Sequence, residues 1–431
     1  MGYQQFLYLQ NQIHGFILHG MKRIYSQLMN EYLQQFPCIA VIGARQAGKT
    51  TMVRMLPDEW RYFDLERISD FDQVSRDPEL FLRLHPDRTV IDEAQMLPEL
   101  FPALRVAIDD DRTRKGRFVI TGSSSPTLQR NVAESLAGRV AVVEMSPLLW
   151  AEAAGGQAVS PVVHRLTSFR SRMKTRELID GLQPRGTVRE AHDYWFRGGY
   201  PEPWLAGNER FYRRWTDQYV ESYLNRDIAR LFPNLNQVRF RQFLGMMSGL
   251  SGEVLNYAEV ARNLQVSQPT ARDYFEIAHG TFLWRRLPAY DRNVRKRVVK
   301  HPKGYMRDSG LLHRLLRIPD LDALLSHPRC GRSWEGMVVE ELLRQFNALG
   351  EPVQAYHYRT SGGAEIDLVL EGDFGLLPIE VKYGQKVEAR ALRVVREFID
   401  EHDCALGIVA SNEREPRLYD EKIIGIPFVY L

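Results

Sequence analysis

The chain has 431 residues, of which 44% are hydrophobic and 26% are charged, a composition typical of soluble globular proteins. No stretch approaches the 18 uninterrupted apolar residues of a membrane-spanning helix, so we predict no membrane contact. The formal net charge is only +3, so the field of the whole protein does not indicate a nucleic-acid partner. Its three cysteines lie too far apart for a metal-type pair or a disulfide framework, which favours a cytoplasmic location.

The first twenty residues contain no Asp, Glu, Lys or Arg. A secretory signal needs a positive start and a long apolar run, but Gln, Asn and His interrupt this stretch. Residues from Met21 onward have the pattern of an ordinary N-terminal helix. Two interpretations stay open for residues 1–20: a non-native or disordered extension before a true start at Met21, or a native tail.

The first predicted domain covers residues 21–150. Within it, short β-branched runs alternate with helical stretches, and four near-continuous apolar runs have strand length: CIAVIG, TVIDEA, RFVITGS and RVAVVEM. Such runs are typical of buried strands in a parallel sheet. The alternation of strands and helices predicts an α/β layer fold.

A complete phosphate-binding motif follows the first of these strands. Residues 43–50 fit G-x-x-x-x-G-K-[ST], with an apolar strand before them and a helix after them. Glycines let the backbone close around phosphates, while Lys49 reaches the β- and γ-phosphates and Thr50 ligates Mg²⁺. The predicted cofactors are therefore ATP and Mg²⁺. The predicted nucleotide-binding residues are Gly43, Ala44, Arg45, Gln46, Ala47, Gly48, Lys49, Thr50 and Thr51.

The second apolar run ends in two acids that complete this site. We expect Asp92 to lie near the magnesium ion, through a water molecule. The neighbouring Glu93 would orient or deprotonate the attacking water, as a general base does. A phosphate-binding loop with this acidic strand at the expected distance predicts binding and hydrolysis of ATP.

Six segments in a fixed order carry a family resemblance: GARQAGKTT, VIDEAQ, TGSSS, SLAGRV, FRGGYPE and RDI. Together they resemble a large bacterial and archaeal group of predicted AAA-type ATPases with a C-terminal domain of unknown function. The similarity runs from about Met21 to the end of the chain. Residues 151–190 depart from it, because this stretch is longer than expected before Gly198-Gly199-Tyr200-Pro201.

The resemblance implies two further catalytic residues beside Lys49 and Glu93. Ser123, after the third strand, takes the place of a polar sensor of the γ-phosphate, and the alternative is an ordinary Gly-Ser turn. Arg139 takes the place of an arginine finger, which acts on the neighbouring subunit and implies a homo-oligomer. For Arg139 the alternative is a surface salt bridge.

Two predicted segments form the middle of the chain. Residues 151–235 are interpreted as an insertion and helical connector, and residues 236–310 as a winged helix-turn-helix. In the latter, a short amphipathic helix at 257–264 and a tight turn precede Ser267, a good N-cap for a second helix. A strand at 282–287 follows, which is the winged-helix order.

This segment leaves two interpretations open. In a DNA-binding protein, Gln268, Thr270, Arg272 and Asp273 would face the major groove. Arg295, Lys296 and Arg297 would bind phosphate, since residues 285–303 contain eight basic residues against one acid. In the alternative, the winged helix packs between domains and the basic run is solvated; Asp273 and Glu276 on the reading helix argue mildly for this.

The last predicted domain covers residues 311–431. Glu335 lies near the start of a helix, Asp367 lies on a strand, and Glu380 and Lys382 share one face of the next strand. This order resembles restriction-endonuclease-like domains, in which carboxylates hold Mg²⁺ and a lysine helps to activate water. Glu365 is an alternative ligand to Asp367, although it should face the opposite side of the strand.

The complete prediction is an α/β protein with an AAA-type P-loop core and parallel sheet, a helical connector, a winged helix and a restriction-endonuclease-like domain. One hypothesis is an ATP-hydrolysing, DNA-associated enzyme with a metal-dependent nuclease domain. The other is an ATP-dependent switch or scaffold whose C-terminal half only binds a protein or nucleic-acid partner. Acids that converge within ligand distance favour the first hypothesis, and acids buried against cationic side chains favour the second.

Overall fold

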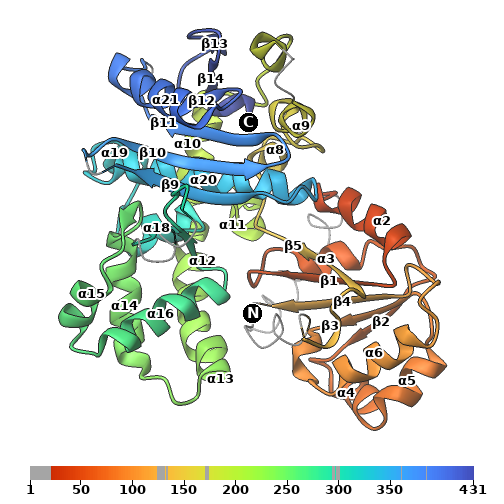
Figure 1. The fold of residues 1–431 in the computed structure, drawn as a ribbon. Helices are drawn as coiled ribbons and strands as arrows, with labels where there is room; N and C mark the ends of the chain where they lie inside the picture. The colour runs from red at the N-terminus through yellow and green to blue at the C-terminus, as the bar shows by residue number, and fades with distance from the viewer. Residues whose placement is uncertain are drawn as a thin grey trace. The chain divides into compact units, whose positions relative to one another are not determined.

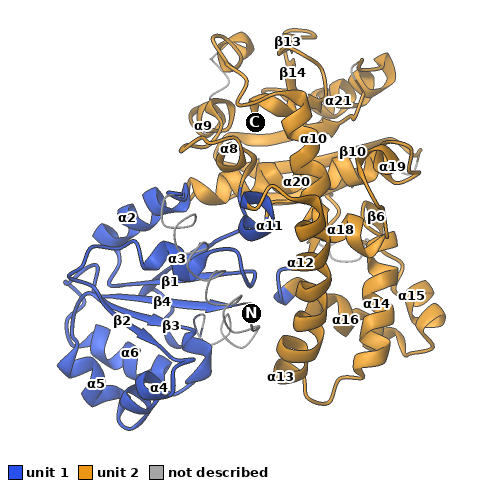
Figure 2. Cartoon of the chain, turned by 180° about the vertical axis from the view of Figure 1, so that it is seen from behind, with its two compact units in different colours: residues 1–148, 200–205, 280–282 blue, residues 149–199, 206–279, 283–431 orange. Residues whose placement is uncertain are grey.

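The computed structural model describes residues 21–123, 132, 134–169, 174–293, 297, 301–360, 362–384 and 386–431. These residues form two compact units (Figure 2). Unit 1 contains the described residues up to Leu148 together with 200–205 and 280–282, and unit 2 contains the rest. The predicted extension at 1–20 lies outside the described residues. Among the helices described, none is long and apolar enough to cross a membrane.

A five-stranded parallel sheet forms the core of unit 1 (Figure 1). The strand order is β2-β3-β4-β1-β5. The four predicted strands are confirmed, and their apolar runs are explained by burial of the central strands on both faces. The fifth strand, β2, was not predicted from the apolar runs, because it is a partly exposed edge strand. The bounds are β1 Cys38–Gly43, β2 Arg61–Asp64, β3 Thr89–Asp92, β4 Phe118–Ser123 and β5 Val140–Glu144.

Short helices cover this sheet, with α2 and α3 on one side and α4, α5 and α6 toward the other (Figure 1). Helix α5 has an ordinary N-cap: the Asp77 side chain accepts a hydrogen bond from the amide of Leu80 at 2.9 Å, and Pro78 occupies the first turn. The bounds are α2 Tyr25–Gln35, α3 Lys49–Val53, α4 Ile68–Ser75, α5 Pro78–Leu84, η1 Ala94–Met96, α6 Leu100–Asp109 and, later in the chain, α11 Pro201–Leu205.

A six-stranded mixed sheet in the order β13-β14-β12-β11-β10-β9 dominates the C-terminal part of unit 2. Strand β10 pairs antiparallel with both β9 and β11, whereas β11, β12 and β14 run parallel. A helix, α21, contributes Val395, Phe398 and Ile399 to the hydrophobic cluster on this sheet. The bounds are β9 Gln354–Arg359, β10 Glu365–Gly372, β11 Gly375–Val381, α21 Ala389–His402, β12 Gly407–Ser411, β13 Arg417–Leu418, β14 Ile423–Pro427 and η4 Phe428–Tyr430.

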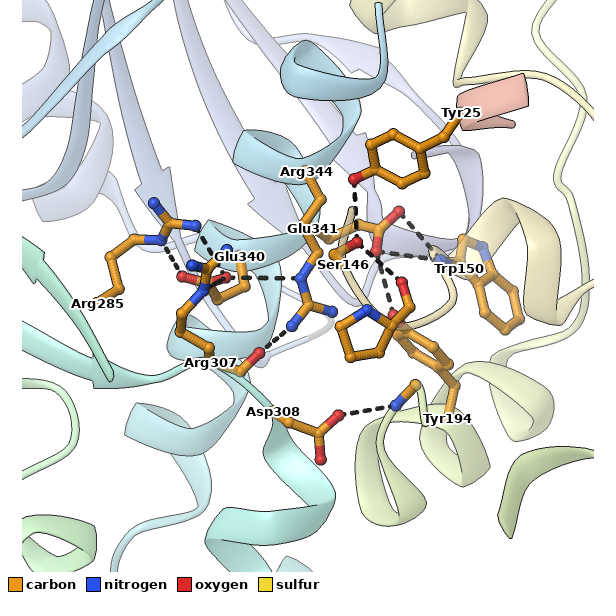
Figure 3. A network of polar contacts seen from close by, with 12 residues as sticks. Tyr25, Ser146, Trp150, Tyr194, Arg285, Arg307, Asp308, Glu340, Glu341 and Arg344 are labelled. Carbon is orange, nitrogen blue, oxygen red and sulfur yellow. Dashed lines mark hydrogen bonds and ion pairs between the residues drawn. The ribbon is translucent and has the colours of Figure 1, made fainter. Parts of the chain in front are cut away.

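Helix α20, Cys330–Ala348, is almost entirely buried in unit 2. It begins at Cys330, so Glu335, expected near the start of a helix, lies in its second turn. A buried ionic network holds it: Glu340 pairs with Arg285, Arg307 and Arg344 (Figure 3). Burial alone would raise the pKa of Glu340, but these three charges outweigh it and lower the pKa to about 2.

The neighbouring Glu341 ties this helix to the predicted insertion. Its carboxylate accepts the amide of Trp150 at 3.1 Å and the hydroxyl of Tyr194 at 3.3 Å (Figure 3). The stretch therefore contributes structure to unit 2 as short helices: α8 Trp150–Ala153, α9 Pro161–Ser168, η2 Thr175–Leu178 and α10 Val188–Arg197. The rest of the predicted helical connector contains α12 Glu209–Ser222, a π-helical turn η3 Tyr223–Ile228 and α13 Ala229–Leu231.

The middle segment follows the predicted order of elements. The helix expected at 257–264 is α15, and Ser267 caps the second helix by accepting the amide of Thr270 at 3.2 Å. Strands β6, β8 and β7 form a small antiparallel sheet. The winged-helix assignment itself stays a prediction. The bounds are α14 Gln237–Gly249, β6 Glu253–Val254, α15 Tyr257–Leu264, α16 Gln268–Gly280, β7 Trp284–Leu287, β8 Lys303–Met306, α18 Ser309–Leu315 and α19 Leu321–Leu325.

Candidate functional site

The phosphate-binding loop connects β1 to α3, as the motif predicts. Gly43 lies where a side chain cannot fit, because a Cβ there would stand 2.0 Å from the backbone oxygen of Met145. Gly48 has a φ of 97°, a conformation that glycine adopts without strain, immediately before α3 begins. These two glycines let the loop close tightly and direct the first amides of the helix toward the loop.

Lys49 and Thr50 occupy the start of α3. The buried ammonium of Lys49 donates to the backbone oxygens of Gly43 at 3.1 Å and Ala44 at 2.9 Å, so it lies across the loop. The Thr50 hydroxyl donates to Asp92 at 2.8 Å. This contact joins the P-loop to the acidic strand, and it places the two predicted magnesium ligands beside each other.

Asp92 is only 2% exposed and receives three hydroxyl groups. Besides Thr50, the hydroxyls of Tyr62 and Thr121 donate to its carboxylate. Burial, and then the charge of Asp92, raise the pKa of Tyr62 well above its usual value, so the phenol stays a donor. Sequence reasoning missed both Tyr62 and Thr121. Both lie on the strands that flank β3, Tyr62 on β2 and Thr121 on β4.

Glu93 is held beside this acid in an unusual backbone conformation. Its φ of 56° lies in the left-handed region, which costs a non-glycine residue free energy and is common at functional sites. Its carboxylate accepts hydrogen bonds from Ser123 at 3.0 Å and from the amide of Gln95. Gln95 also donates to Ser123 at 3.3 Å. Ser123, the predicted phosphate sensor, therefore contacts the predicted base.

Arg23 is a second residue that the sequence did not reveal. Its buried guanidinium donates to the backbone oxygen of Ala47 at 2.6 Å and to that of Ser146 at 2.9 Å. It thereby joins the P-loop to the segment after β5 through backbone contacts. Nothing in the sequence signals this role, because Arg23 lies 24 residues from Ala47 and outside the motif.

Arg139 forms a two-point salt bridge with Asp109. Its Nε lies 2.7 Å from Asp109 Oδ1 and its Nη2 lies 2.8 Å from Oδ2. The hydrogen bond from Arg139 is the largest cause of the lowered Asp109 pKa, which is about 2. In this conformation Arg139 has the partner that the salt-bridge alternative requires, and its action on a neighbouring subunit stays a prediction.

The candidate DNA-contacting residues of α16 lie on its exposed face. Gln268 and Arg272 are exposed, and the Arg272 guanidinium lies 5.2 Å from the ring centre of Tyr257. The Thr270 hydroxyl contacts Ser267 at 2.8 Å as part of the helix cap. Asp273 and Glu276 share the exposed surface, and Glu276 pairs with Arg286. DNA contact by this face stays a prediction.

The basic run 285–303 does not form a free cationic patch in the part that the structure describes. Arg297 donates to Glu371 at 3.2 Å and to the Tyr356 hydroxyl at 2.8 Å. Arg285 pairs with Glu340 in the buried network. Arg295 and Lys296 lie outside the described residues. The described part of the run thus contributes to internal packing, and phosphate binding by the run stays a prediction.

The predicted C-terminal residues do come together. Leu368 pairs with Ile379 in the antiparallel register of β10 and β11, which sets Asp367 opposite Glu380 on one face. Asp367 accepts the amide of Val381 at 2.9 Å, and Lys382 contacts Glu380 at 2.6 Å. A register shift between β9 and β10 falls at Ile366 to Val369, and such bulges often re-aim side chains at functional sites.

Glu335 approaches the same cluster from α20. Burial, with the charge of Asp367, raises its pKa to about 7, and the same two causes raise the pKa of Glu380 to about 8. Glu380 is 6% exposed, and among the described residues its Oε2 has no hydrogen-bond partner. Glu365 is instead exposed and pairs with Arg359 at 2.9 Å, which places it away from the cluster as expected.

Lys303 and Tyr305 of β8 complete the cluster, and sequence reasoning missed both roles. Lys303 Nζ lies 2.5 Å from Glu335 Oε1 and 3.4 Å from Asp367 Oδ1, while the Tyr305 hydroxyl donates to Glu335. Within the described residues, no group of three or more His, Cys, Asp and Glu is arranged to hold a metal ion. As it stands, the cluster is a set of acids bridged by ammonium groups and does not fit a bound metal.

Comparisons with known proteins agree with the first site. A model of the AAA domain matches residues 35–154, and models of two domains of unknown function, DUF8612 and DUF4143, match residues 188–322 and 330–429. Among solved structures, a Walker-type ATPase of Pyrococcus abyssi is similar with a TM-score of 0.44 at 14% identity. That likeness covers 68% of this chain and 94% of the other.

Two curated relatives are similar over most of the chain. They are uncharacterized protein Rv2008c of Mycobacterium tuberculosis and uncharacterized protein Mb2031c of Mycobacterium bovis. Each is 36% identical over 399 residues, which is 92% of this chain and 81% of the relative. The chain therefore belongs to the same family as these mycobacterial proteins, and it is an AAA-family P-loop ATPase with two further domains of unknown function.

Proposed function

We propose that this protein hydrolyses ATP, with Glu93 as the general base. The observation that carries the proposal is the meeting of three parts at one end of the parallel sheet: the P-loop lysine, the Thr50–Asp92 contact and the Glu93 carboxylate. Lys49 would leave the loop carbonyls to neutralise the β- and γ-phosphates. Bound Mg²⁺ would supply further neutralisation of phosphate charge, and Thr50 and Asp92 are the residues that would hold it.

Ser123 and Gln95 orient the base in this proposal. Both donate toward the Glu93 carboxylate, which as general base would accept a proton from water. Ser123 could contact the γ-phosphate only by exchanging this hydrogen bond, so the sensor and orienting roles are two states of one side chain. The left-handed backbone of Glu93 is consistent with a residue held for function at some cost in stability.

The assembly is proposed to be a homo-oligomer in which Arg139 acts on the neighbouring subunit. An arginine finger stabilises charge on the transferred phosphoryl group. Arg139 would first have to exchange its bidentate contact with Asp109 for the phosphate. Asp109 therefore holds the arginine in a subunit that has no partner at this face.

The direct test is release of phosphate from ATP by the full chain in Mg²⁺. Wild-type protein should turn over ATP, and the Lys49→Ala variant should bind ATP far more weakly and release no phosphate. Chelation of Mg²⁺ should stop turnover without unfolding the protein. Tight ATP binding by the wild type with no phosphate release, with or without nucleic acid, would leave a nucleotide-dependent switch without hydrolysis.

A second candidate function is metal-dependent cleavage of phosphodiesters by the C-terminal domain. The observation that favours it is the convergence of Glu335, Asp367 and Glu380 from three different elements beside Lys382. A divalent ion supplies activated water and charge neutralisation in such sites. In the observed conformation the acids are bridged by lysines, so this activity requires a rearranged cluster.

The protein should then nick DNA or RNA in Mn²⁺ or Mg²⁺ in at least one nucleotide state. Asp367→Ala should abolish nicking, while Glu365→Ala, at an exposed carboxylate on the same strand, should not. If several forms of nucleic acid stay intact with both metals, with and without ATP, the domain is a binding scaffold for a partner.

A further inference from the structure

Lys303 occupies a central position in the acidic cluster of unit 2. It is 6% exposed and reaches from β8, in the small three-stranded sheet, to carboxylates on α20 and on β10. Its ammonium lies between Glu335 and Asp367, two acids that would otherwise repel each other in a buried environment. A cation in such a place performs the electrostatic role that a metal ion has in carboxylate sites.

The charges of the cluster show what depends on Lys303. With every group ionised, Glu335, Asp367 and Glu380 carry three negative charges, and Lys303 and Lys382 carry two positive charges. Without Lys303, three carboxylates would face a single ammonium, an excess of two negative charges that one divalent ion would balance. Hard divalent cations prefer carboxylate oxygens, and the unpartnered Oε2 of the buried Glu380 provides one.

We propose that Lys303 is an internal cation that takes the place of a divalent metal ion, so that the cluster excludes metal while Lys303 bridges Glu335 and Asp367. This inference rests on the second candidate function, since it concerns the same carboxylates. It explains how acids suited to a metal can be buried together in a metal-free conformation.

The test compares Mn²⁺ binding by nucleotide-free wild-type protein and by the Lys303→Met variant, measured by calorimetric titration. Methionine has a similar length and no charge, so it removes the ammonium while it fills most of the space. We expect Mn²⁺ to bind the variant at least about tenfold more tightly than the wild type, a difference of about 1.4 kcal/mol. Adding Glu380→Gln to Lys303→Met should remove the gain.

Two further variants serve as a control and as a substitute. Lys422→Met removes another ammonium of unit 2. Among the described contacts, this ammonium binds only the backbone oxygen of Cys404, at 3.4 Å, so the variant should leave Mn²⁺ affinity unchanged. Lys303→Gln can still donate a hydrogen bond to Glu335, so it replaces the methionine variant if that variant fails to fold. Circular dichroism and thermal melting establish which variants are folded.

Equal Mn²⁺ affinity of the wild type and a folded Lys303 variant would overturn the proposal. If the wild type and the variant both bind Mn²⁺, Lys303 does not compete with the metal. If neither protein binds Mn²⁺, Lys303 is not the group that excludes it. Because the experiment measures metal binding, its result is separate from that of the cleavage assay. A gain in Mn²⁺ affinity without nicking of nucleic acid would support the proposal for Lys303 and contradict the nuclease proposal.

Discussion

The two acidic sites of this protein are held together by opposite means. At the P-loop, neutral hydroxyl groups hold the acids: Thr50, Tyr62 and Thr121 donate to Asp92. In the C-terminal cluster, the Tyr305 hydroxyl also donates to Glu335, but the contact that joins the acids is ionic, since the Lys303 ammonium bridges Glu335 and Asp367. A hydroxyl can rotate away from a carboxylate with little change in charge, whereas a buried ammonium that leaves must be replaced by another cation.

This difference indicates which site is prepared for a ligand. Hydroxyl donors would leave the carboxylate of Asp92 available to the magnesium ion that we propose arrives with ATP. Lysine donors neutralise the acids of the C-terminal cluster, so a metal ion must compete with a covalently attached cation. The first site is therefore expected to act on its ligand directly, and the second to need a conformational change first.

Arg139 gives the sharpest test of whether an ion pair must open before a site can act. It is a cation paired with an acid, Asp109, and its proposed function requires this pair to separate. If it is a finger, Arg139→Ala should lower the ATP turnover number about 1000-fold with ATP affinity unchanged. Asp109→Asn should lower turnover far less, because it frees the arginine. Steady-state kinetics and nucleotide titration measure both.

A mixing experiment provides the control for action between subunits. Combining Arg139→Ala with Glu93→Gln subunits should partly restore turnover, since some interfaces then contain an intact Glu93 and an intact Arg139. Equal, small losses in Arg139→Ala and Asp109→Asn, with no recovery on mixing, would make the pair a structural salt bridge.

Lys49→Ala should weaken ATP binding about 100-fold or more, because charge-assisted contacts to the phosphates contribute about 3 kcal/mol. Fluorescent-nucleotide titration measures the loss. The Lys115→Ala variant, which removes a lysine that contacts only the Arg112 carbonyl among the contacts resolved, is the matched control and should bind normally. Unchanged affinity of the Lys49 variant would contradict the P-loop assignment.

Ser123→Ala should reduce ATP turnover by about tenfold, because Glu93 would keep its contact with Gln95 and lose only one orienting donor. Ser123→Thr retains a hydroxyl and should recover much of the rate. Recovery of turnover by the threonine hydroxyl separates an orienting role from a packing role.

The C-terminal cluster predicts a pH dependence of stability that Glu380→Gln should remove. The folded-state pKa of Glu380, about 8, lies above its ordinary value, so the folded protein binds its proton more tightly than the unfolded chain does. Its contribution is complete at low pH and is lost as pH rises from about 4.5 to 8. The glutamine, which resembles the protonated acid, should raise the melting temperature by a few degrees at pH 9 relative to wild type and by less at pH 5.

An equal effect of Glu380→Gln at both pH values would mean that Glu380 is already ionised in the folded protein. Lys382 would then be a stronger partner than its single contact at 2.6 Å implies. Thermal melting of wild type and variant across this range decides between the two.

The P-loop site was largely predictable because its chemistry is local. Gly43 to Thr50 form one continuous motif, and Asp92 and Glu93 end an apolar strand at the expected distance. The same patterns predicted four of the five strands of the parallel sheet, since buried parallel strands leave long apolar runs. Tyr62 and Arg23 escaped prediction, because one lies on a partly exposed edge strand and the other acts on backbone atoms.

The C-terminal cluster was predictable in its carboxylates but not in its cation. Asp367, Glu380 and Lys382 follow from strand alternation, which fixes the face of each side chain. Lys303 was counted with a basic run because its charged neighbours suggested a phosphate-binding surface. Only tertiary structure brings β8 to α20 and β10, so pattern alone could not assign Lys303 to the acids.

Glu93→Gln tests the central claim, ATP hydrolysis at the P-loop, most directly. Full-length wild type and variant are mixed with radiolabelled ATP and Mg²⁺ in a single turnover, and bound ATP and ADP are separated with time. We predict that the variant binds ATP with wild-type affinity and forms ADP more slowly by about 100-fold or more, because an amide cannot accept the proton of water. ADP formation at the wild-type rate would contradict the role of Glu93 and the mechanism built on it.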